Sequence, residues 1–139
     1  MNEHAKELVK VLRSGEFQQG QGQLRTKDDH YCCLGVACEL HRRVTGLGRW
    51  EWFEDDWSYV VTDKAGNAVD RNDSVLPEPV MKYFGFGFVG GSYSTEEYDE
   101  DDYDKEFPYR RELTEDNDGG RSFEEIASII ESGPKGLFR

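Results

Sequence analysis

The sequence predicts an α+β fold, a single domain in which three to four helices pack on a small antiparallel sheet. Three observations predict it. Apolar residues recur at helical spacing in residues 3–13, 34–45 and 122–132. Aromatic and β-branched residues, interrupted by turn signals, fill residues 50–70. A length of 139 residues is typical of one domain with one core.

The first helix is expected over residues 3–13, where one apolar stripe runs along a polar segment. Asn2 can cap its first turn, and Ser14 and Gly15 end it. The stripe consists of residues at i, i+3, i+4 and i+7: Ala5, Leu8, Val9 and Leu12. This spacing predicts that one face of the helix lies on the core.

A second, central helix is expected over residues 34–45. It follows "YCCLGV", which we interpret as the turn from a strand into the helix, with Cys33 in the core and Gly35 permitting close packing. Gly46 ends the helix. Its predicted apolar face is Cys33, Val36, Ala37, Leu40 and Val44.

Strands are expected before and after this central helix. In residues 17–32 we predict an irregular loop and then a short hairpin, in which residues 23–25 pair with residues 31–32. Residues 50–70 contain "SYVVTDKAGNAVD", where β-branched residues flank a turn and predict another hairpin. We expect the two regions to form one antiparallel sheet that the helices cover.

Two more helices are expected in the second half of the chain. "LPEPVMKYFGF" predicts a short helix that begins at a proline. Its inward residues are Val80, Met81 and Phe84. Residues 122–132 begin with a capping box of Ser122 and Glu125 and end at Gly133. The preceding "LTEDNDGG" is interpreted as a turn.

Charge is distributed unevenly along the chain. The net charge of −12 argues against binding to a nucleic-acid backbone or to an anionic membrane, because both need a basic face. Residues 95–106 contain eight acids and one lysine, and so carry −7 of that charge. We interpret residues 92–108 as an acidic, flexible insertion in a single domain of residues 1–139.

Targeting signals are missing from the sequence. No apolar run approaches the roughly 18 residues that a membrane-spanning helix needs. The first residues lack the apolar core of a signal peptide. The sequence therefore predicts a cytosolic protein whose three cysteines are reduced.

Five residues with metal-binding or nucleophilic chemistry lie within twelve positions: His30, Cys32, Cys33, Cys38 and His41. A zinc site usually takes two close ligand pairs, and no CxxC is present. Cys32, near a helix start and near His30, is a candidate nucleophile. We favour core packing, because buried free cysteine behaves as a small hydrophobe, and we predict no metal and no other cofactor.

The candidate ligand site draws on two segments of the chain. In "QQGQGQLR" the glutamine amides can donate and accept hydrogen bonds, and the arginine can clamp a phosphate or a carboxylate. Two tryptophans two residues apart share one face of a strand, where they can stack a base. The predicted site is Gln19, Gln21, Gln23, Arg25, Tyr31, Trp50 and Trp52. The alternatives are a plain polar loop and an aromatic core.

Residues 12–131 resemble a family of small, uncharacterised proteins of bacteriophages and prophages. The least generic shared motifs are "GQLR", "YCCLGV" and the pattern ND-G-SF-EIA. The family offers no established activity or catalytic residues. The resemblance implies a phage accessory protein in the host cytoplasm, and such proteins often antagonise host defence or redirect a host enzyme.

Three functions follow from these observations. The favoured one is a non-enzymatic antagonist of host defence that sequesters a small anionic, nucleotide-type ligand. The second is a protein-binding inhibitor or DNA mimic that presents the acidic segment to a basic host protein. The third is a Cys–His or metal-dependent hydrolase. The expected partners are the anionic ligand, a host protein or a second copy in a homo-oligomer, and neither nucleic acid nor a membrane.

Overall fold

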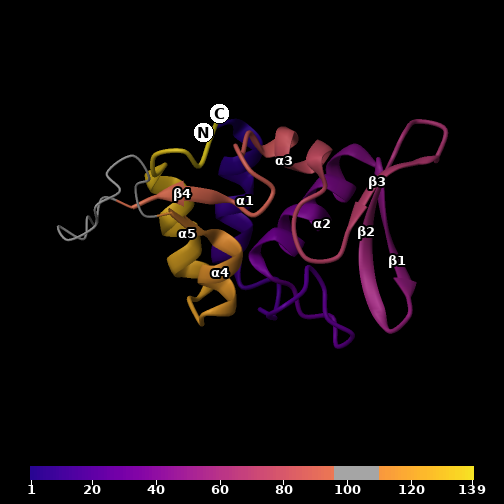
Figure 1. Cartoon of the computed structure of the whole chain (residues 1–139), viewed down its shortest axis with the longest axis horizontal. Helices are drawn as coiled ribbons and strands as arrows, with labels where there is room; N and C mark the ends of the chain where they lie inside the picture. Colours follow the sequence, from indigo (N-terminus) through magenta and orange to yellow (C-terminus); the bar gives the residue numbers. More distant parts are fainter. Residues whose placement is uncertain (96–109) are drawn as a thin grey trace.

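The computed structural model describes residues 1–95 and 110–139 and has the α+β fold that the sequence predicts. Figure 1 shows the sheet of β1, β2 and β3 at one end of the molecule, α4 and α5 at the other, and α2 between them. The elements in chain order are α1 (Glu3–Ser14), α2 (Cys33–Thr45), β1 (Gly48–Phe53), β2 (Asp56–Thr62), β3 (Ala68–Asn72), α3 (Glu78–Phe84), β4 (Ser92–Ser94), β5 (Arg110–Glu112), α4 (Leu113–Asp118) and α5 (Phe123–Ser132).

The helix α2 lies at the centre of the fold. Every residue from Cys33 to His41 is buried, as expected of a helix that contacts neighbours on all sides. These neighbours are α1, α3, α4 and β1. Val44 lies past the covered part and is 66% exposed, so its predicted place on the apolar face is wrong.

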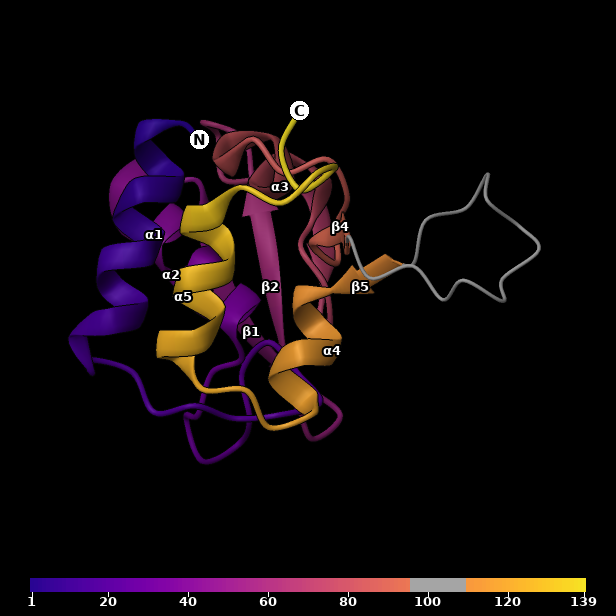
Figure 2. The ribbon, with the colours of Figure 1, turned by 90° about the vertical axis from the view of Figure 1, so that its left-hand side faces the viewer.

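The helices α1 and α5 lie side by side, as Figure 2 shows. Both bury the predicted stripes and carry the predicted caps: Asn2 accepts a hydrogen bond from the Ala5 amide, and Ser122 forms its capping box with Glu125. Arg13 joins the two helices through Glu124 and Glu131. Their main contacts are thus with each other, whereas α2 also packs on β1 of the sheet.

The sheet has the order β1-β2-β3 and is antiparallel throughout. Trp50 pairs with Tyr59, and Trp52 pairs with Trp57. Side chains directly opposite each other lie on one face of a sheet. All four rings therefore share a face, and the Tyr59 hydroxyl on that face contacts His41 of α2.

Residues 17–32 contribute no strand to this sheet, so the prediction of one sheet from residues 17–32 and 50–70 is wrong. They form isolated bridges at Tyr31. The expected short hairpin is reduced to two backbone hydrogen bonds: the Thr26 amide donates to the His30 carbonyl (2.8 Å), and the Cys32 amide donates to the Leu24 carbonyl (3.2 Å). The other backbone groups have scattered partners. The Leu24 amide, for example, donates to the Asp73 carbonyl at 2.8 Å.

The elements of the second half that the sequence analysis does not predict are α4 and the paired strands β4 and β5. Residues 113–118 form the short helix α4, not a turn, because Leu113, Asp116 and Asn117 are all buried on one side. The predicted short helix is present as α3, where Val80 and Phe84 are buried.

The predicted acidic insertion overlaps β4 at its start, where Tyr93 is 6% exposed. Its residues 96–108 lie outside the part of the chain that the structure describes. Within the described residues, no helix is long and apolar enough to cross a membrane.

Candidate functional site

The predicted ligand residues separate into two groups in the structure. The side chains of Gln19 and Gln21 bond to Asn117 of α4, although the backbone of Gln19 forms a bridge with Tyr31. The predicted arginine, tyrosine and two tryptophans meet at the sheet's aromatic face. Gln23 is half-buried and makes no side-chain hydrogen bond to a described residue.

The glutamine segment is tied to the fold through Asn117, which is fully buried. The Asn117 Oδ1 accepts hydrogen bonds from Gln19 Nε2 (2.9 Å) and from the Cys33 amide (3.2 Å). Its Nδ2 donates to the Gly20 carbonyl at 2.8 Å. Gln21 reaches the Asn117 carbonyl at 3.4 Å. We therefore assign Gln19 and Gln21 to holding the loop against α2 and α4.

The other predicted residues form what we call the arginine–tryptophan surface: Arg25, Tyr31, Trp50, Trp52 and Trp57. The Arg25 guanidinium lies 4.0 Å from the centroid of the Trp57 ring, 5.5 Å from that of Trp50 and 5.6 Å from that of Tyr31. Trp52 packs edge-on against Trp57 at 5.3 Å and is 46% exposed. A cation stacked on aromatic rings is thus joined to an open aromatic ring.

Trp57 is the member of this surface that the sequence-based prediction missed. Its position as the cross-strand partner of Trp52 follows from the β1–β2 register, which depends on the turn at Glu54 and Asp55. Both turn residues have positive φ. The sequence gives no strong signal for this turn, because two-residue hairpin turns with positive φ are usually marked by Asn-Gly or Asp-Gly.

The charge of Arg25 is partly compensated. Asp29 accepts from its Nη2 at 2.7 Å through Oδ1, while Nη1 has no hydrogen-bond partner among the described residues. The Arg25 side chain is 17% exposed and that of Asp29 is 61% exposed. Burial raises the pKa of the neighbouring Tyr31 hydroxyl, and the charge of Arg25 opposes this effect.

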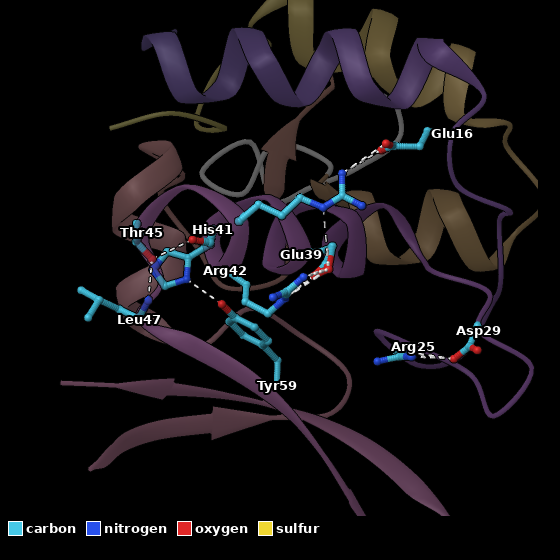
Figure 3. A network of polar contacts seen from close by, with 10 residues as sticks. Glu16, Arg25, Asp29, Glu39, His41, Arg42, Thr45, Leu47 and Tyr59 are labelled. Atoms are coloured by element: carbon cyan, nitrogen blue, oxygen red, sulfur yellow. Dashed lines mark hydrogen bonds and ion pairs between the residues drawn. The ribbon is translucent and has the colours of Figure 1, made fainter. Parts of the chain in front are cut away.

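The adjoining side of α2 is a closed polar network, shown in Figure 3. Glu39 is 5% exposed and accepts from Arg42, and Arg43 donates to Glu16 at 3.1 Å. Like these two arginines, Arg25 faces a carboxylate, and its side chain, 17% exposed, is more covered than those of Arg42 and Arg43. Arg25 is the one that stands over the tryptophans.

A buried pair closes the other end of this network. The His41 Nδ1 lies 2.7 Å from the Tyr59 hydroxyl, as Figure 3 shows. Burial lowers the pKa of His41 and raises that of Tyr59, so both stay neutral near pH 7. The pair anchors the aromatic face of the sheet to α2.

The three cysteines line the core, as predicted. Cys32 is the N-cap of α2, and its sulfur accepts from the Gly35 amide at 3.3 Å. Burial nevertheless raises the pKa of Cys32 to about 11 and those of Cys33 and Cys38 well above normal, so burial outweighs the effect of the helix start. In the described residues, no three His, Cys, Asp or Glu side chains are grouped as metal ligands.

The fold and this surface define a small α+β domain with a buried, cysteine-containing central helix and an exposed arginine–tryptophan surface. The chain belongs to the family described as Domain of unknown function (DUF8296), whose model matches residues 1–133. Neither a curated protein nor a solved structure matches it significantly. Because the family description names no activity, the function has to be argued from the surface.

Proposed function

We propose that the protein is a non-enzymatic ligand-binding protein that captures a small anionic ligand of the nucleotide type on the arginine–tryptophan surface. The observation that carries this proposal is the Arg25 guanidinium 4.0 Å above Trp57, next to the exposed ring of Trp52. A nucleotide needs a cation for its phosphate and an aromatic face for its base. On this surface the cation and the aromatic rings are in direct contact.

The geometry suggests how such a ligand would lie. One face of Trp57 is covered by Arg25, so the base stacks on Trp52, whose ring is 46% exposed. The phosphate then takes the Nη1 group of Arg25, which has no hydrogen-bond partner among the described residues. It competes with the exposed carboxylate of Asp29, which holds the other edge.

Capture needs no general acid, base or nucleophile. This agrees with a chain whose cysteines lie in the core with raised pKa values. The phage origin, the host cytoplasm and a role against host defence are part of the proposal and rest on sequence resemblance. In that setting a nucleotide immune signal is the ligand class that the surface fits.

The alternative function is protein binding through the acidic segment. Residues 96–106 of that segment lie outside the described residues. The described chain offers a second acidic feature for a protein partner: Phe53, at the tip of the β1–β2 hairpin, is 67% exposed and precedes the acidic run Glu54, Asp55 and Asp56. An aromatic, acidic tip fits a basic protein surface with an apolar pocket.

Titration calorimetry with a panel of linear and cyclic nucleotides tests the favoured function. We expect saturable binding of one nucleotide class by the full chain. Trp52→Ala should weaken it about tenfold or more, since stacking one base on an aromatic ring contributes roughly 1–3 kcal/mol. The melting temperature of this variant should change little, because the Trp52 ring is half exposed.

Phe53→Ala is the matched control, since it removes a neighbouring exposed ring on the other face of β1. It should leave nucleotide binding unchanged. Absence of binding by every nucleotide, or equal losses in the two variants, would contradict the proposal.

A further inference from the structure

A second group of arginines lies where β5 runs into α4 (Figure 2), and α4 lies at the end of the molecule opposite the sheet (Figure 1). This group surrounds a pocket of about 320 Å³. We call it the arginine pocket, and its lining is Arg110, Arg111, Glu115, Asp116, Gly119 and Arg121. Among the described lining residues, three are cations and two are acids, in a chain whose net charge is −12.

A buried carboxylate organises this pocket. Asp116 is 7% exposed, and its Oδ1 lies 3.5 Å from Arg121 Nε and 4.0 Å from Arg111 Nη1. The Tyr93 hydroxyl donates to its Oδ2. The carboxylate is thus fixed in place, and it draws two guanidinium groups from different elements toward one point.

The third arginine is not part of this ion-pair network. Arg110 contacts no carboxylate among the described residues and lies 5.3 Å from the ring of Phe88. Arg139 approaches the same ring at 5.6 Å. A structural network between β5 and α4 accounts for Arg111 and Arg121, whereas Arg110 packs on Phe88 and leaves its guanidinium without a carboxylate among the described residues.

We propose that the arginine pocket binds a small, multiply charged oxyanion of the phosphate class. Arg110, Arg111 and Arg121 donate to its oxygens, which match the fork of a guanidinium in size and charge. Asp116 is a positioning residue that holds two of the forks in place and competes with the ligand for them. The pocket shares no residue with the arginine–tryptophan surface, so the two sites stand or fall separately.

The test is calorimetric titration of the full chain with inorganic pyrophosphate at low ionic strength, with sodium chloride at matched ionic strength as the blank. Pyrophosphate has no base, so it does not depend on Trp52. We expect saturable binding that Arg110→Gln weakens about tenfold, because a charge-assisted hydrogen bond is lost. This variant should fold normally, since Arg110 is exposed and makes no ion pair to a described residue.

Arg71→Gln is the charge-matched control. Arg71 is an exposed arginine of β3 on the sheet, and its substitution changes the net charge equally. It should leave pyrophosphate binding unchanged. No saturable binding of pyrophosphate, or equal weakening by the two substitutions, would overturn the proposal.

Asp116→Asn separates ligand binding from a structural role. The amide keeps an oxygen that accepts from Tyr93 but removes the charge that competes for Arg111 and Arg121. Pyrophosphate should bind this variant about tenfold tighter. A network that serves only the fold predicts lower stability with no gain in affinity, and that result would count against the site.

Discussion

At the scale of single residues, Asn117 connects more of the chain than any other side chain described here. Its amide joins the loop at Gln19 and Gly20 to the first turn of α2 at Cys33. The sequence motifs "GQLR", "YCCLGV" and "ND" are therefore close together in space. Their sequence pattern marked them as distinctive, but it gave no means of telling a shared hydrogen-bond network from a ligand site.

Replacing this amide should substantially lower the protein's free energy of unfolding. Asn117→Ala leaves the Gly20 carbonyl and the Cys33 amide buried without their partner. Each unsatisfied buried group costs roughly 1–3 kcal/mol, so we expect the free energy of unfolding to fall by about 4 kcal/mol. Urea denaturation followed by tryptophan fluorescence measures it.

The neighbouring Asp118→Ala is the control for this substitution. Asp118 is exposed, and its main contact is the Gly22 amide at 2.9 Å. Its loss should cost about 1 kcal/mol or less. If the two substitutions had similar effects, Asn117 would not be the junction that the hydrogen bonds indicate.

At the scale of elements, α2 shows how one glycine sets a helix's position. A Cβ at Gly35 would lie 1.8 Å from the Leu24 carbonyl oxygen, so the loop crosses directly over the helix. The prediction that Gly35 permits close packing is thereby confirmed. The helix also keeps its start at Cys32 because that sulfur accepts from the Gly35 amide.

Gly35→Ala should therefore destabilise the protein although alanine favours helices. Helix propensity alone predicts a gain of roughly 1 kcal/mol. The overlap with backbone atoms of residue 24 forces the loop or the helix to move, and we expect a net loss of about 3 kcal/mol or more. Thermal unfolding followed by circular dichroism gives the sign directly.

Val44→Ala on the same helix provides the comparison. Val44 is 66% exposed, so propensity should dominate and the change should be neutral or slightly stabilising. A stable Gly35→Ala variant would show that the loop does not pass so close to the helix.

The elements that the sequence predicts well are those whose signals are local. The caps and apolar stripes of α1 and α5 lie within each segment and are confirmed. The helix α4 spans only six residues and has no apolar period that would mark it as a helix. Its buried residues have partners nearly a hundred positions away, which a local pattern does not show. For the same reason the course of residues 17–32, whose backbone bonds reach as far as Asp73, could not be foreseen.

The same limit applies to the candidate site. Arg25, Tyr31, Trp50 and Trp52 were predicted from residue type, and the fold brings them together. Trp57 and the arginine pocket depend on strand register and on a helix that the pattern does not show. Residue chemistry is visible in a sequence, whereas convergence of distant segments is not.

At the scale of the whole molecule, β4 and β5 bring the two sides of the acidic segment together. Ser94 and Arg110 are directly paired, and opposed Cα atoms in antiparallel strands are about 5 Å apart. A short turn can therefore join them. The described residues on both sides of this segment form a continuous hydrophobic core of helices and sheet.

Replacing residues 96–109 by a four-residue Gly-Asn-type turn should leave the protein folded. Closing a shorter loop costs less conformational entropy, so the free energy of unfolding should rise by roughly 1 kcal/mol. Binding of nucleotides at the arginine–tryptophan surface should persist, since that surface lies at the other end of the molecule. Calorimetry and thermal unfolding measure both. Loss of activity in cells with nucleotide binding intact would instead favour the protein-binding alternative.

The rate at which the buried cysteines react with a thiol reagent reports how often the core opens. Cys33 and Cys38 have essentially no exposed surface, and their thiols hold their protons. A thiol reagent can reach them only when the central helix parts from its neighbours, so the rate of labelling follows the opening of the core. In the folded chain the three thiols are shielded from oxidants in the solvent. An unfolded chain exposes three thiols, an odd number, and is open to cross-linking with its neighbours.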